Sequence, residues 1–439
     1  MKMIYNVSDK PKMGQTIVFA FQQLLAILAA TIAVPAIVGN GMSTSAALFG
    51  AGVGTIVYLL FTKFKSPVFL GSSFAFIGSM FAAFAGASST ALGYLGMILG
   101  AVFAGLVYVL LAAIVKACGV AWINKLMPAV VIGPTVAIIG LSLAGNAIGD
   151  LGAAPNADAS FYLCLICGLV TLFVTMLCSV FGKKMLKMIP FIIGIAAGYA
   201  VAAAFTVIGI STGNVALEII DFSKFQNMQW VPEFTFLTAF GGFGELSASY
   251  IGTVAVAYVP VAFVVFAEHI ADHKNLSSII EQDLLEEPGL HRTLLGDGVG
   301  SMCGAFFGGC PNTTYGESVG CVAISRNASV VTILTTAFLA IIASFFAPFV
   351  TLLATIPNCV MGGVCVALYG FIAVSGLKMV QGVDLNKNRN LFVVSVILIA
   401  GIGGLSISFG KVTLTSVACA LILGIITNLL LKNEPDDEE

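Results

Sequence analysis

The chain has 439 residues, of which 59% are hydrophobic and 9% are charged, and its 19 basic and 21 acidic residues give a formal net charge of -2. Ordinary soluble domains contain ~45–50% apolar and ~25% charged residues, so this chain has too few charges to cover a water-exposed surface. The composition argues against a soluble enzyme, a nucleic-acid-binding protein and a disordered protein. It predicts a membrane protein that is surrounded mainly by lipid.

The first fifteen residues are polar, and the apolar run that follows them is long enough to span a bilayer. A secretory signal would have a shorter apolar run of ~7–15 residues and a cleavage site of small residues. We therefore interpret the run as a retained first span. Apolar runs separated by Gly, Pro, Asn or charge predict fourteen spans in all. They are 16–38, 45–62, 71–86, 92–116, 127–145, 160–181, 188–210, 250–272, 292–308, 312–325, 328–350, 358–377, 391–408 and 413–431.

The distribution of lysine and arginine tests this number of spans. Fourteen spans place both termini on one side of the membrane. With the N-terminus in the cytoplasm, 17 of the 19 basic residues fall on the cytoplasmic side, and only Lys224 and Lys411 fall outside. With a wrong number of spans, the basic residues would be divided between both sides of the membrane. We predict a multi-pass protein of the cytoplasmic (inner) membrane with both termini cytoplasmic.

Seven spans lie on each side of a more polar stretch at 212–249, and an odd number forces the second half to enter the membrane in the opposite sense. This pattern predicts an inverted repeat, with a first repeat at 16–211 and a second at 250–431. The third and tenth segments are short and begin with Gly, Ser or Thr. We predict extended strands at 71–76 and 313–318 that face each other, each leading into a half helix. The predicted fold class is an all-α polytopic membrane protein with two short antiparallel strands in its broken segments.

Two acids lie in the apolar eighth segment. Glu268 follows seven apolar residues, and Asp272 comes four residues later on the same helical face, nearer the cytoplasmic end. An acid within a membrane segment is by default a candidate for a functional role. A carboxylate at the end of the helix is the alternative interpretation, and it is stronger for Asp272 than for Glu268. His269 falls on another face of the same helix.

A third acid, Glu317, stands in the broken tenth segment between Gly316 and Gly320. A carboxylate there could cap the half helix by accepting hydrogen bonds from free backbone N–H groups. Together with the acids of the eighth segment, it predicts a shared polar site beside the break. Asp297 in the ninth segment and Glu245 near the outer end of the eighth are weaker candidates.

The sequence indicates no further chemistry. The ten cysteines are scattered, and Cys164 with Cys167 lacks a second pair at metal-ligand spacing, so we interpret these two as buried thiols. The sequence contains no motif for a metal site, a phosphate-binding loop, a nucleophile triad or an ATP-binding cassette. We therefore predict a transporter, not an enzyme, with no cofactor and no metal, driven by an ion gradient or passive.

Several motifs resemble the bacterial nucleobase branch of the nucleobase/ascorbate transporter family. They are AEHIADH at 267–273, DLL and PGLHR within 283–292, PNTTYGE at 311–317, and GSSFAF at 71–76. The resemblance covers nearly the whole chain.

The family signature runs from an acid or Gln through Asn and Gly to Thr and a basic residue. Here Glu317, Gly320 and Arg326 match it, whereas Ser318 replaces the usual Asn and Ser325 replaces the usual Thr.

The resemblance implies fourteen segments divided into two domains. The core domain would comprise approximately 16–126 plus 250–350, and the gate domain approximately 127–211 plus 358–431. The implied function is uracil import coupled to protons by alternating access between the two sides of the membrane. The implied partners are uracil, protons, membrane lipid and a second copy of the chain in a homodimer, with no nucleic acid.

The resemblance also assigns roles to individual residues. Glu268 and Glu317 would hold the base, the backbone at Phe74 and Gly316 would supply further hydrogen bonds, and aromatic rings at Tyr315 and Tyr369 would pack on it. Proton coupling would involve Glu268, Asp272 and Glu317.

Two departures affect the implied proton route. Some relatives have His where this chain has Asp272, and some have His in the first segment where this chain has Gln23. Ser318 also leaves the identity of the base open. One alternative is the same fold carrying xanthine or another purine. The other, from a different class, is an anion exchanger or channel of similar fold, although two acids facing a cavity argue against an anion.

Overall fold

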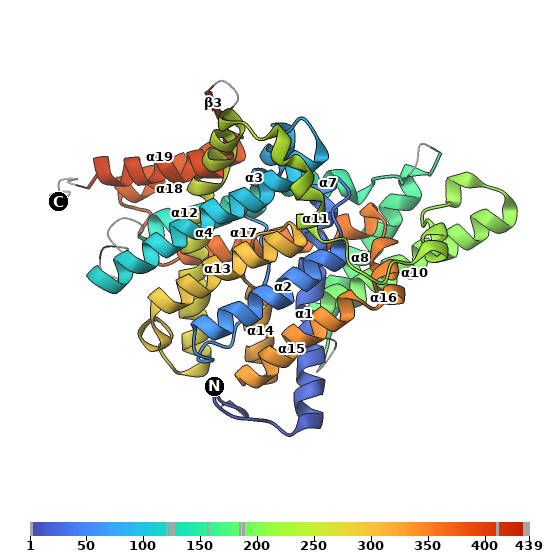
Figure 1. The fold of residues 1–439 in the computed structure, drawn as a ribbon, viewed down its shortest axis with the longest axis horizontal. Coiled ribbons are helices and arrows are strands. Elements are labelled where there is room, and N and C mark those ends of the chain that lie inside the picture. Colours follow the sequence, from blue (N-terminus) through green and yellow to red (C-terminus); the bar gives the residue numbers. More distant parts are fainter. Residues whose placement is uncertain are drawn as a thin grey trace.

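The computed structural model describes residues 3–119, 122, 128–155, 158–183, 186, 189–409 and 412–432, which are almost entirely helical (Figure 1). The elements up to residue 212 are α1 (Met13–Val38), α2 (Thr44–Phe61), β1 (Leu70–Ser72), α3 (Ile77–Ala85), α4 (Thr90–Cys118), α6 (Ala129–Ser142), α7 (Ala144–Leu151), α8 (Phe161–Phe181) and α10 (Pro190–Thr212). The predicted domain boundary at 126–127 and Lys411 lie outside the described residues.

The long polar stretch folds into short helical turns before the next long helix. These turns are η1 (Val215–Leu217), η2 (Phe222–Asn227), α11 (Thr235–Ala239) and η3 (Phe240–Glu245). The remaining elements are α12 (Ala248–Ile280), η4 (Leu285–Gly289), α13 (Leu290–Gly308), β2 (Asn312–Thr314), α14 (Gly316–Ser325), α15 (Val330–Ser344), α16 (Ala347–Ala354), α17 (Asn358–Val380), α18 (Asn388–Ile402), β3 (Ile407–Phe409), β4 (Val412–Leu414) and α19 (Ser416–Leu430).

The prediction of a mostly helical protein with many apolar helices is confirmed. Among the described residues, eight helices are long and apolar enough to cross a membrane, or nine if α15 and α16, which meet at 82°, form one broken span. Each of the fourteen predicted ranges overlaps at least one of the helices. The number of crossings and the inverted repeat remain predictions. The hairpin of β3 and β4 just before α19 was not predicted.

Two groups of helices pack around the centre of the molecule. In the first, α13 lies between α2 and α4, α15 packs on α1 and α2, and α12 packs on α4 (Figure 1). Glycines allow the close approach of α2 and α13, because a Cβ on Gly50 would lie 2.6 Å from the Gly304 carbonyl oxygen. Small residues serve this purpose in membrane helices, which gain little from hydrophobic burial against one another.

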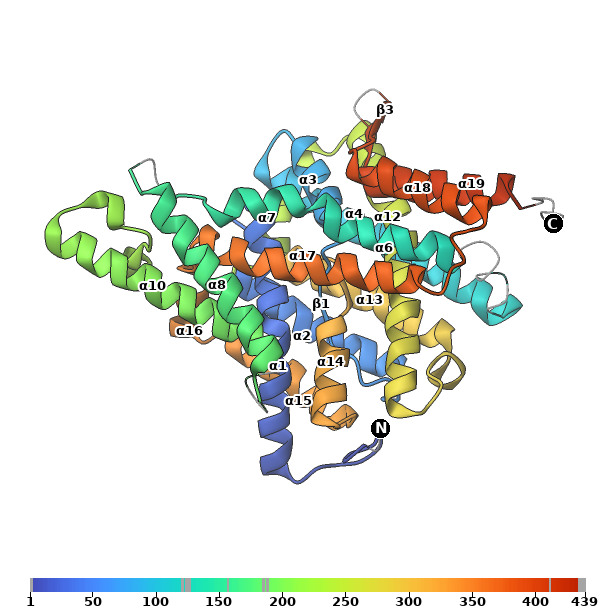
Figure 2. The same ribbon diagram turned by 180° about the vertical axis from the view of Figure 1, so that it is seen from behind.

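The second group faces the viewer when the molecule is turned by 180° (Figure 2). There α17 packs on α6, α7 and α8, α10 packs on α8, and α18 packs on α6 and α19. A Cβ on Gly376 of α17 would lie 2.2 Å from the Ala137 backbone nitrogen of α6. Cys164 and Cys167 on α8 are buried, as interpreted from the sequence. The two groups resemble the predicted core and gate domains in membership, and that division remains a prediction.

Candidate functional site

The site is built around a break in two membrane segments. Strands β1 and β2 pair antiparallel, with Leu70 opposite Thr314 and Ser72 opposite Asn312. The ladder continues on both sides, because Ser73 N donates to the Pro311 carbonyl at 2.9 Å and Tyr315 N donates to the Phe69 carbonyl at 3.3 Å. All residues of the two strands are buried. Backbone that leaves a helix inside the protein must find hydrogen-bond partners there, and each strand supplies them for the other.

The extended stretches are shorter than predicted. Extended backbone was expected over 71–76 and 313–318, whereas β1 ends at Ser72 and α14 already begins at Gly316. Glu317 therefore lies in the first turn of a helix and not in a strand. A carboxylate is favourable at that position because the N-terminal end of a helix is electropositive, which explains why the helix begins there.

Neighbouring side chains fix the strands. The Thr55 hydroxyl on α2 accepts from Leu70 N at 2.9 Å and lies 3.2 Å from the Leu70 carbonyl. The Tyr315 hydroxyl donates to the Ser72 carbonyl at 2.9 Å, and its ring covers Gly71, where a Cβ would lie 2.3 Å from the ring. Tyr315 is thus buried under the strands. Its predicted packing against a base is not tested by this position.

Three carboxylates gather beside the break, as their sequence positions predicted. Glu268, Asp272 and Glu317 are each half-buried, and Glu268 lies within electrostatic range of the other two. Asp272 on α12 accepts a hydrogen bond from the Thr314 hydroxyl of β2 at 2.7 Å. Within the described part of the chain, the Glu268 carboxylate has no hydrogen-bond or ion-pair partner. An unpartnered carboxylate at a partly open position is available to bind a ligand or a proton.

The start of α14 presents free hydrogen-bond donors beside these acids. The N–H groups in the first turn of a helix have no partner within the helix. Gly316 opens this turn and is exposed, and a Cβ on Gly316 or on Gly320 would meet no atom within 4 Å. Open space therefore lies along this face of α14. The arrangement can accept N–H donors of a ligand at the carboxylates and can donate to its carbonyl oxygens.

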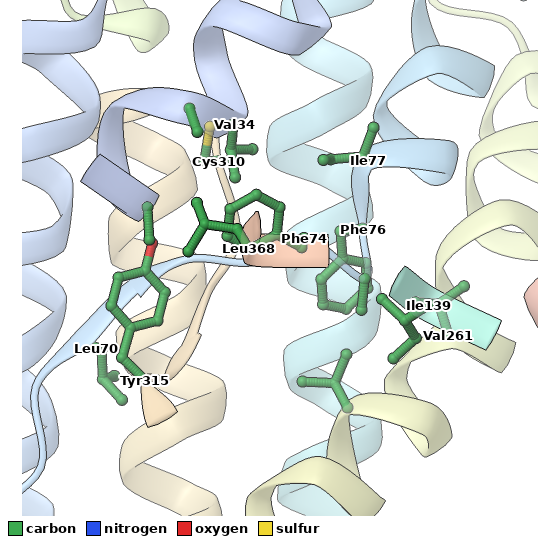
Figure 3. Close-up of a cluster of buried hydrophobic side chains, with 14 of the residues drawn as sticks. Val34, Leu70, Phe74, Phe76, Ile77, Ile139, Val261, Cys310, Tyr315 and Leu368 are labelled. Atoms are coloured by element: carbon green, nitrogen blue, oxygen red, sulfur yellow. The ribbon is translucent and has the colours of Figure 1, made fainter. Parts of the chain in front are cut away.

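Aromatic rings border the break. Phe74, between β1 and α3, packs edge-to-face on Tyr369 of α17, with ring centroids 5.7 Å apart and an interplanar angle of 80°. Phe76 stacks on Tyr258 of α12 at 5.5 Å. Figure 3 shows Phe74, Phe76 and Tyr315 among the buried apolar side chains around the strands. The structure therefore brings Phe74 and Tyr369 together at a junction between the two helix groups, and their predicted contacts with a base stay predictions.

Two pairings were not predicted from the sequence. Gln23 on α1 donates to the Ser318 hydroxyl, which also accepts from Phe69 N at 3.1 Å. Two of the four residues that depart from the family pattern thus bind each other. His269, expected on another helical face, forms a buried pair with Asp297 of α13. An acid inside an apolar segment signalled Asp297, but nothing in the sequence indicated its partner.

The part of the chain that the structure describes contains no candidate metal site. Among those residues, no cluster of three or more His, Cys, Asp or Glu side chains could hold a metal ion. The ionisable groups outside the membrane segments form local contacts instead. Hydrogen bonds from Ser88 and Ser89 lower the pKa of Glu245 at the end of η3, and Lys65 lowers the pKa of Glu287 by a hydrogen bond and an ion pair.

Solved structures show where this fold occurs elsewhere. The transmembrane domain of a cyanobacterium bicarbonate transporter, BicA, matches 96% of this chain and 99% of its own length with a TM-score of 0.66. Its sequence is only 15% identical to this one. The likeness therefore concerns the fold alone.

Curated relatives match the full chain. The uracil permease of Bacillus caldolyticus is 39% identical over 100% of this chain and 97% of its own length. The uracil permease of Escherichia coli (strain K12) is 36% identical, with coverages of 97% and 94%. The model of the Permease family, whose members are transporters rather than enzymes, matches residues 14–408. The resemblance found in the motifs is confirmed, and the chain is a multi-pass membrane protein that belongs to the Permease family.

Proposed function

We propose that this protein imports uracil across the cytoplasmic membrane as a proton-coupled symporter that works by alternating access. Two half-buried carboxylates beside a break in the membrane helices carry the proposal, since they suit a flat ligand with N–H donors. The full-length relatives named uracil permeases support the choice of base. Uracil has two N–H donors and two carbonyl acceptors on a planar ring, and the site offers partners for both kinds of group.

Glu317 is the carboxylate that holds the base in this proposal. It stays ionised because it lies at the electropositive end of α14, and the backbone N–H groups at Gly316 and near Phe74 answer the carbonyls of the base. Tyr369 and Tyr315 supply aromatic surface. The base would then lie between the third, eighth and tenth segments.

Glu268 is the carboxylate that exchanges the coupling proton. It has no protein partner within the described residues, and Asp272 lies one turn further toward the cytoplasmic end of the same helix. A proton can pass along this face directly or through water. One pH unit contributes ~1.4 kcal/mol per proton, and 100 mV contributes ~2.3 kcal/mol per charge. Together they would support accumulation of several hundred-fold.

The architecture of the cycle follows the two helix groups. The core domain, approximately 16–126 plus 250–350, would carry the base past the gate domain, approximately 127–211 plus 358–431. Phe74 and Tyr369 meet at the junction between these groups, where relative motion would expose the site to one side at a time. Both termini would be cytoplasmic, and two copies would form a homodimer in the lipid bilayer.

Radiolabelled uracil uptake into proteoliposomes, with and without an inward proton gradient, tests the proposal. The parent protein should concentrate uracil only with the gradient. Glu268→Gln resembles a permanently protonated acid, so it should still bind and exchange uracil but lose gradient-driven accumulation. Glu286→Gln, an exposed acid of the inner loop, is the control and should behave as the parent.

Three results would count against the proposal. Concentration of uracil by Glu268→Gln under the gradient would remove the proton role of Glu268. A competition panel in which xanthine or another purine displaces uracil would reassign the base. Transport of bicarbonate or another small anion in place of a base would point to the exchanger class, which shares the fold.

A further inference from the structure

Helix α12 carries ionisable groups on two faces, and the proposed base site uses only one. Glu268 interacts with Glu317 on α14, whereas the next residue, His269, faces α13. There His269 Nδ1 lies 2.7 Å from Asp297 Oδ2, and both side chains are 0% exposed. Ionisable groups inside a membrane segment are costly to bury and are candidates for a functional role.

The partners of His269 determine how many protons the pair can hold. Its Nε2 lies 3.0 Å from the Thr293 hydroxyl, which itself donates to the Leu290 carbonyl at 3.0 Å. A hydroxyl has one proton to donate, so when it donates to Leu290, Nε2 carries a proton of its own and donates to Thr293. Asp297 and Nδ1 then share a second proton. The pair has no net charge in this state, whether that proton resides on the carboxyl or on the imidazole.

Thr293 can also satisfy His269 when the shared proton has left. Asp297 is then a carboxylate, and the single proton of His269 must sit on Nδ1 to donate to it. Nε2 becomes an acceptor, and the Thr293 hydroxyl supplies its proton by rotating away from Leu290. Asp297 and Thr293 therefore provide a partner for each ring nitrogen of His269 in both states, which differ by one proton and one unit of charge.

We propose that Asp297, His269 and Thr293 form a two-state proton-binding site of the transport cycle, set behind the carboxylates that hold the base. The inference rests on the proposed function, because the pair would act on transport through Glu268, the carboxylate that exchanges the coupling proton. Asp297 lies within electrostatic range of Glu268. A proton gained or lost at the pair therefore changes the balance between the two forms of Glu268.

Other ionisable groups surround the pair, and none of them replaces His269 as the partner of Asp297. Among the described residues, Asp297 has no ion pair with Lys or Arg, and its second oxygen, Oδ1, has no hydrogen-bond partner. The charge of Asp297 is therefore neutralised only through the shared proton. The ionisable groups within electrostatic range of the pair are Tyr58 of α2, Tyr108 of α4, and Glu268, Asp272 and His273 of α12.

His273 provides a matched control on the same helix. It is also 0% exposed, and its ring stacks on His269 with centroids 4.0 Å apart. Its Nδ1 lies 2.8 Å from the His269 carbonyl, which can only accept, so Nδ1 carries the proton. Its Nε2 lies 2.7 Å from the Tyr58 hydroxyl, which in turn lies 2.7 Å from the Ser66 hydroxyl. These two hydroxyls can complete the hydrogen bonds of a neutral His273, and no carboxylate is bound to it among the described residues.

Two measurements on the full-length protein test the proton site. The first is infrared spectroscopy during a pH titration without substrate, which follows the bands of carboxyl, carboxylate and imidazole groups. The second is the pH profile of uracil counterflow in proteoliposomes, which needs no driving gradient. Both are made on the parent, Asp297→Asn, Thr293→Val and His273→Gln. Thr293→Val decides the question if Asp297→Asn fails to fold.

We expect the parent spectrum to show a pH-dependent carboxyl or imidazole change that is absent from Asp297→Asn. Either variant of the proton site should move the counterflow profile by about one pH unit or more, whereas His273→Gln should leave it in place. The absence of that change from the parent spectrum, or profiles that coincide with the parent in both variants, would overturn the site. A titrating band in a protein that carries no uracil would support the proton site and refute the proposed function.

Discussion

The two broken segments share a backbone plan and differ in the chemistry that their half helices present. Each strand leads into a short helix, α3 after β1 and α14 after β2. The second position of α3 is Gly78, and the second position of α14 is Glu317. The first turn of α3 contains no acid, whereas that of α14 holds the half-buried carboxylate. The comparison separates a shared scaffold from a site that only one segment carries.

The third position of both half helices is a serine that fastens the helix to a neighbour. Ser79 donates to the Ala257 carbonyl of α12 at 2.7 Å, and Ser318 accepts from Gln23 of α1 and from Phe69 N. Both serines are buried. The scaffold is therefore held in a similar way on both sides, so changes at matched positions can distinguish effects on folding from effects on binding.

Replacing Gly71 with alanine should have the largest effect. The new Cβ would lie 2.3 Å from the Tyr315 ring, which is pinned by its hydrogen bond to Ser72. Overpacking of this kind destabilises by ~1–3 kcal/mol and would separate the strands that position both half helices. Thermal unfolding in detergent and uracil uptake should both fall. Gly78→Ala is the matched control, since its nearest neighbour, a methyl group of Thr415, would lie 3.7 Å away. An unaltered Gly71→Ala protein would contradict the packing described here.

Replacing Glu317 with glutamine should affect binding more than folding. The amide substitutes a donor for one acceptor oxygen and meets a uracil N–H poorly. The loss of a hydrogen bond to a charged group weakens binding by ~1.5–3 kcal/mol, or about 10- to 150-fold in Kd. Calorimetry with uracil measures the effect. Glu245→Gln is the control, because Glu245 lies in η3 and binds Ser88 and Ser89. Parent-like affinity in Glu317→Gln would exclude Glu317 as the base-holding residue.

Replacing Thr314 with valine should have a smaller effect on stability. It removes the hydroxyl that donates to Asp272 at 2.7 Å, which ties β2 to α12. We expect a loss of about 1–2 kcal/mol in the free energy of unfolding. Thr313→Val is a close control, because the buried Thr313 hydroxyl has no hydrogen-bond partner among the described residues. Its loss should be nearly neutral or stabilising. Equal unfolding temperatures for the two variants would show that the Asp272 contact contributes nothing.

The sequence predicted what depends on local pattern and composition. Apolar runs located the helices, and the short Gly-, Ser- and Thr-rich openings located the break. It also selected Glu268, Asp272 and Glu317, because acids are conspicuous in apolar segments. The predicted end of the second strand was wrong, because β2 stops at Thr314 and α14 begins at Gly316. Three paired residues in each strand are enough, and the helix can begin directly after them.

Contacts between distant segments could not be predicted in this way. The bond between Gln23 and Ser318 joins residues 295 positions apart, and the pair of His269 and Asp297 joins two helices. Nothing on one helix indicates its partner on another, and only the packing of α1 on α14, or the approach of α12 to α13, brings the two residues together. The sequence therefore located the acids but not the groups that control them.

Replacing Ser79 with alanine should have the smallest effect and the cleanest interpretation. The variant loses one buried hydrogen bond, to the Ala257 carbonyl, and should lose ~0.5–1.5 kcal/mol of unfolding free energy. Uracil affinity should stay that of the parent, because α3 presents no carboxylate. Ser318→Ala should cause a comparable loss of stability and should also weaken uracil binding. Ser318 fixes α14 to its neighbours, and the preceding residue on α14 is Glu317. Calorimetry and thermal unfolding on both variants decide the matter. If Ser79→Ala weakened uracil binding as much as Ser318→Ala, the first half helix would be part of the site and the contrast between the two segments would fail.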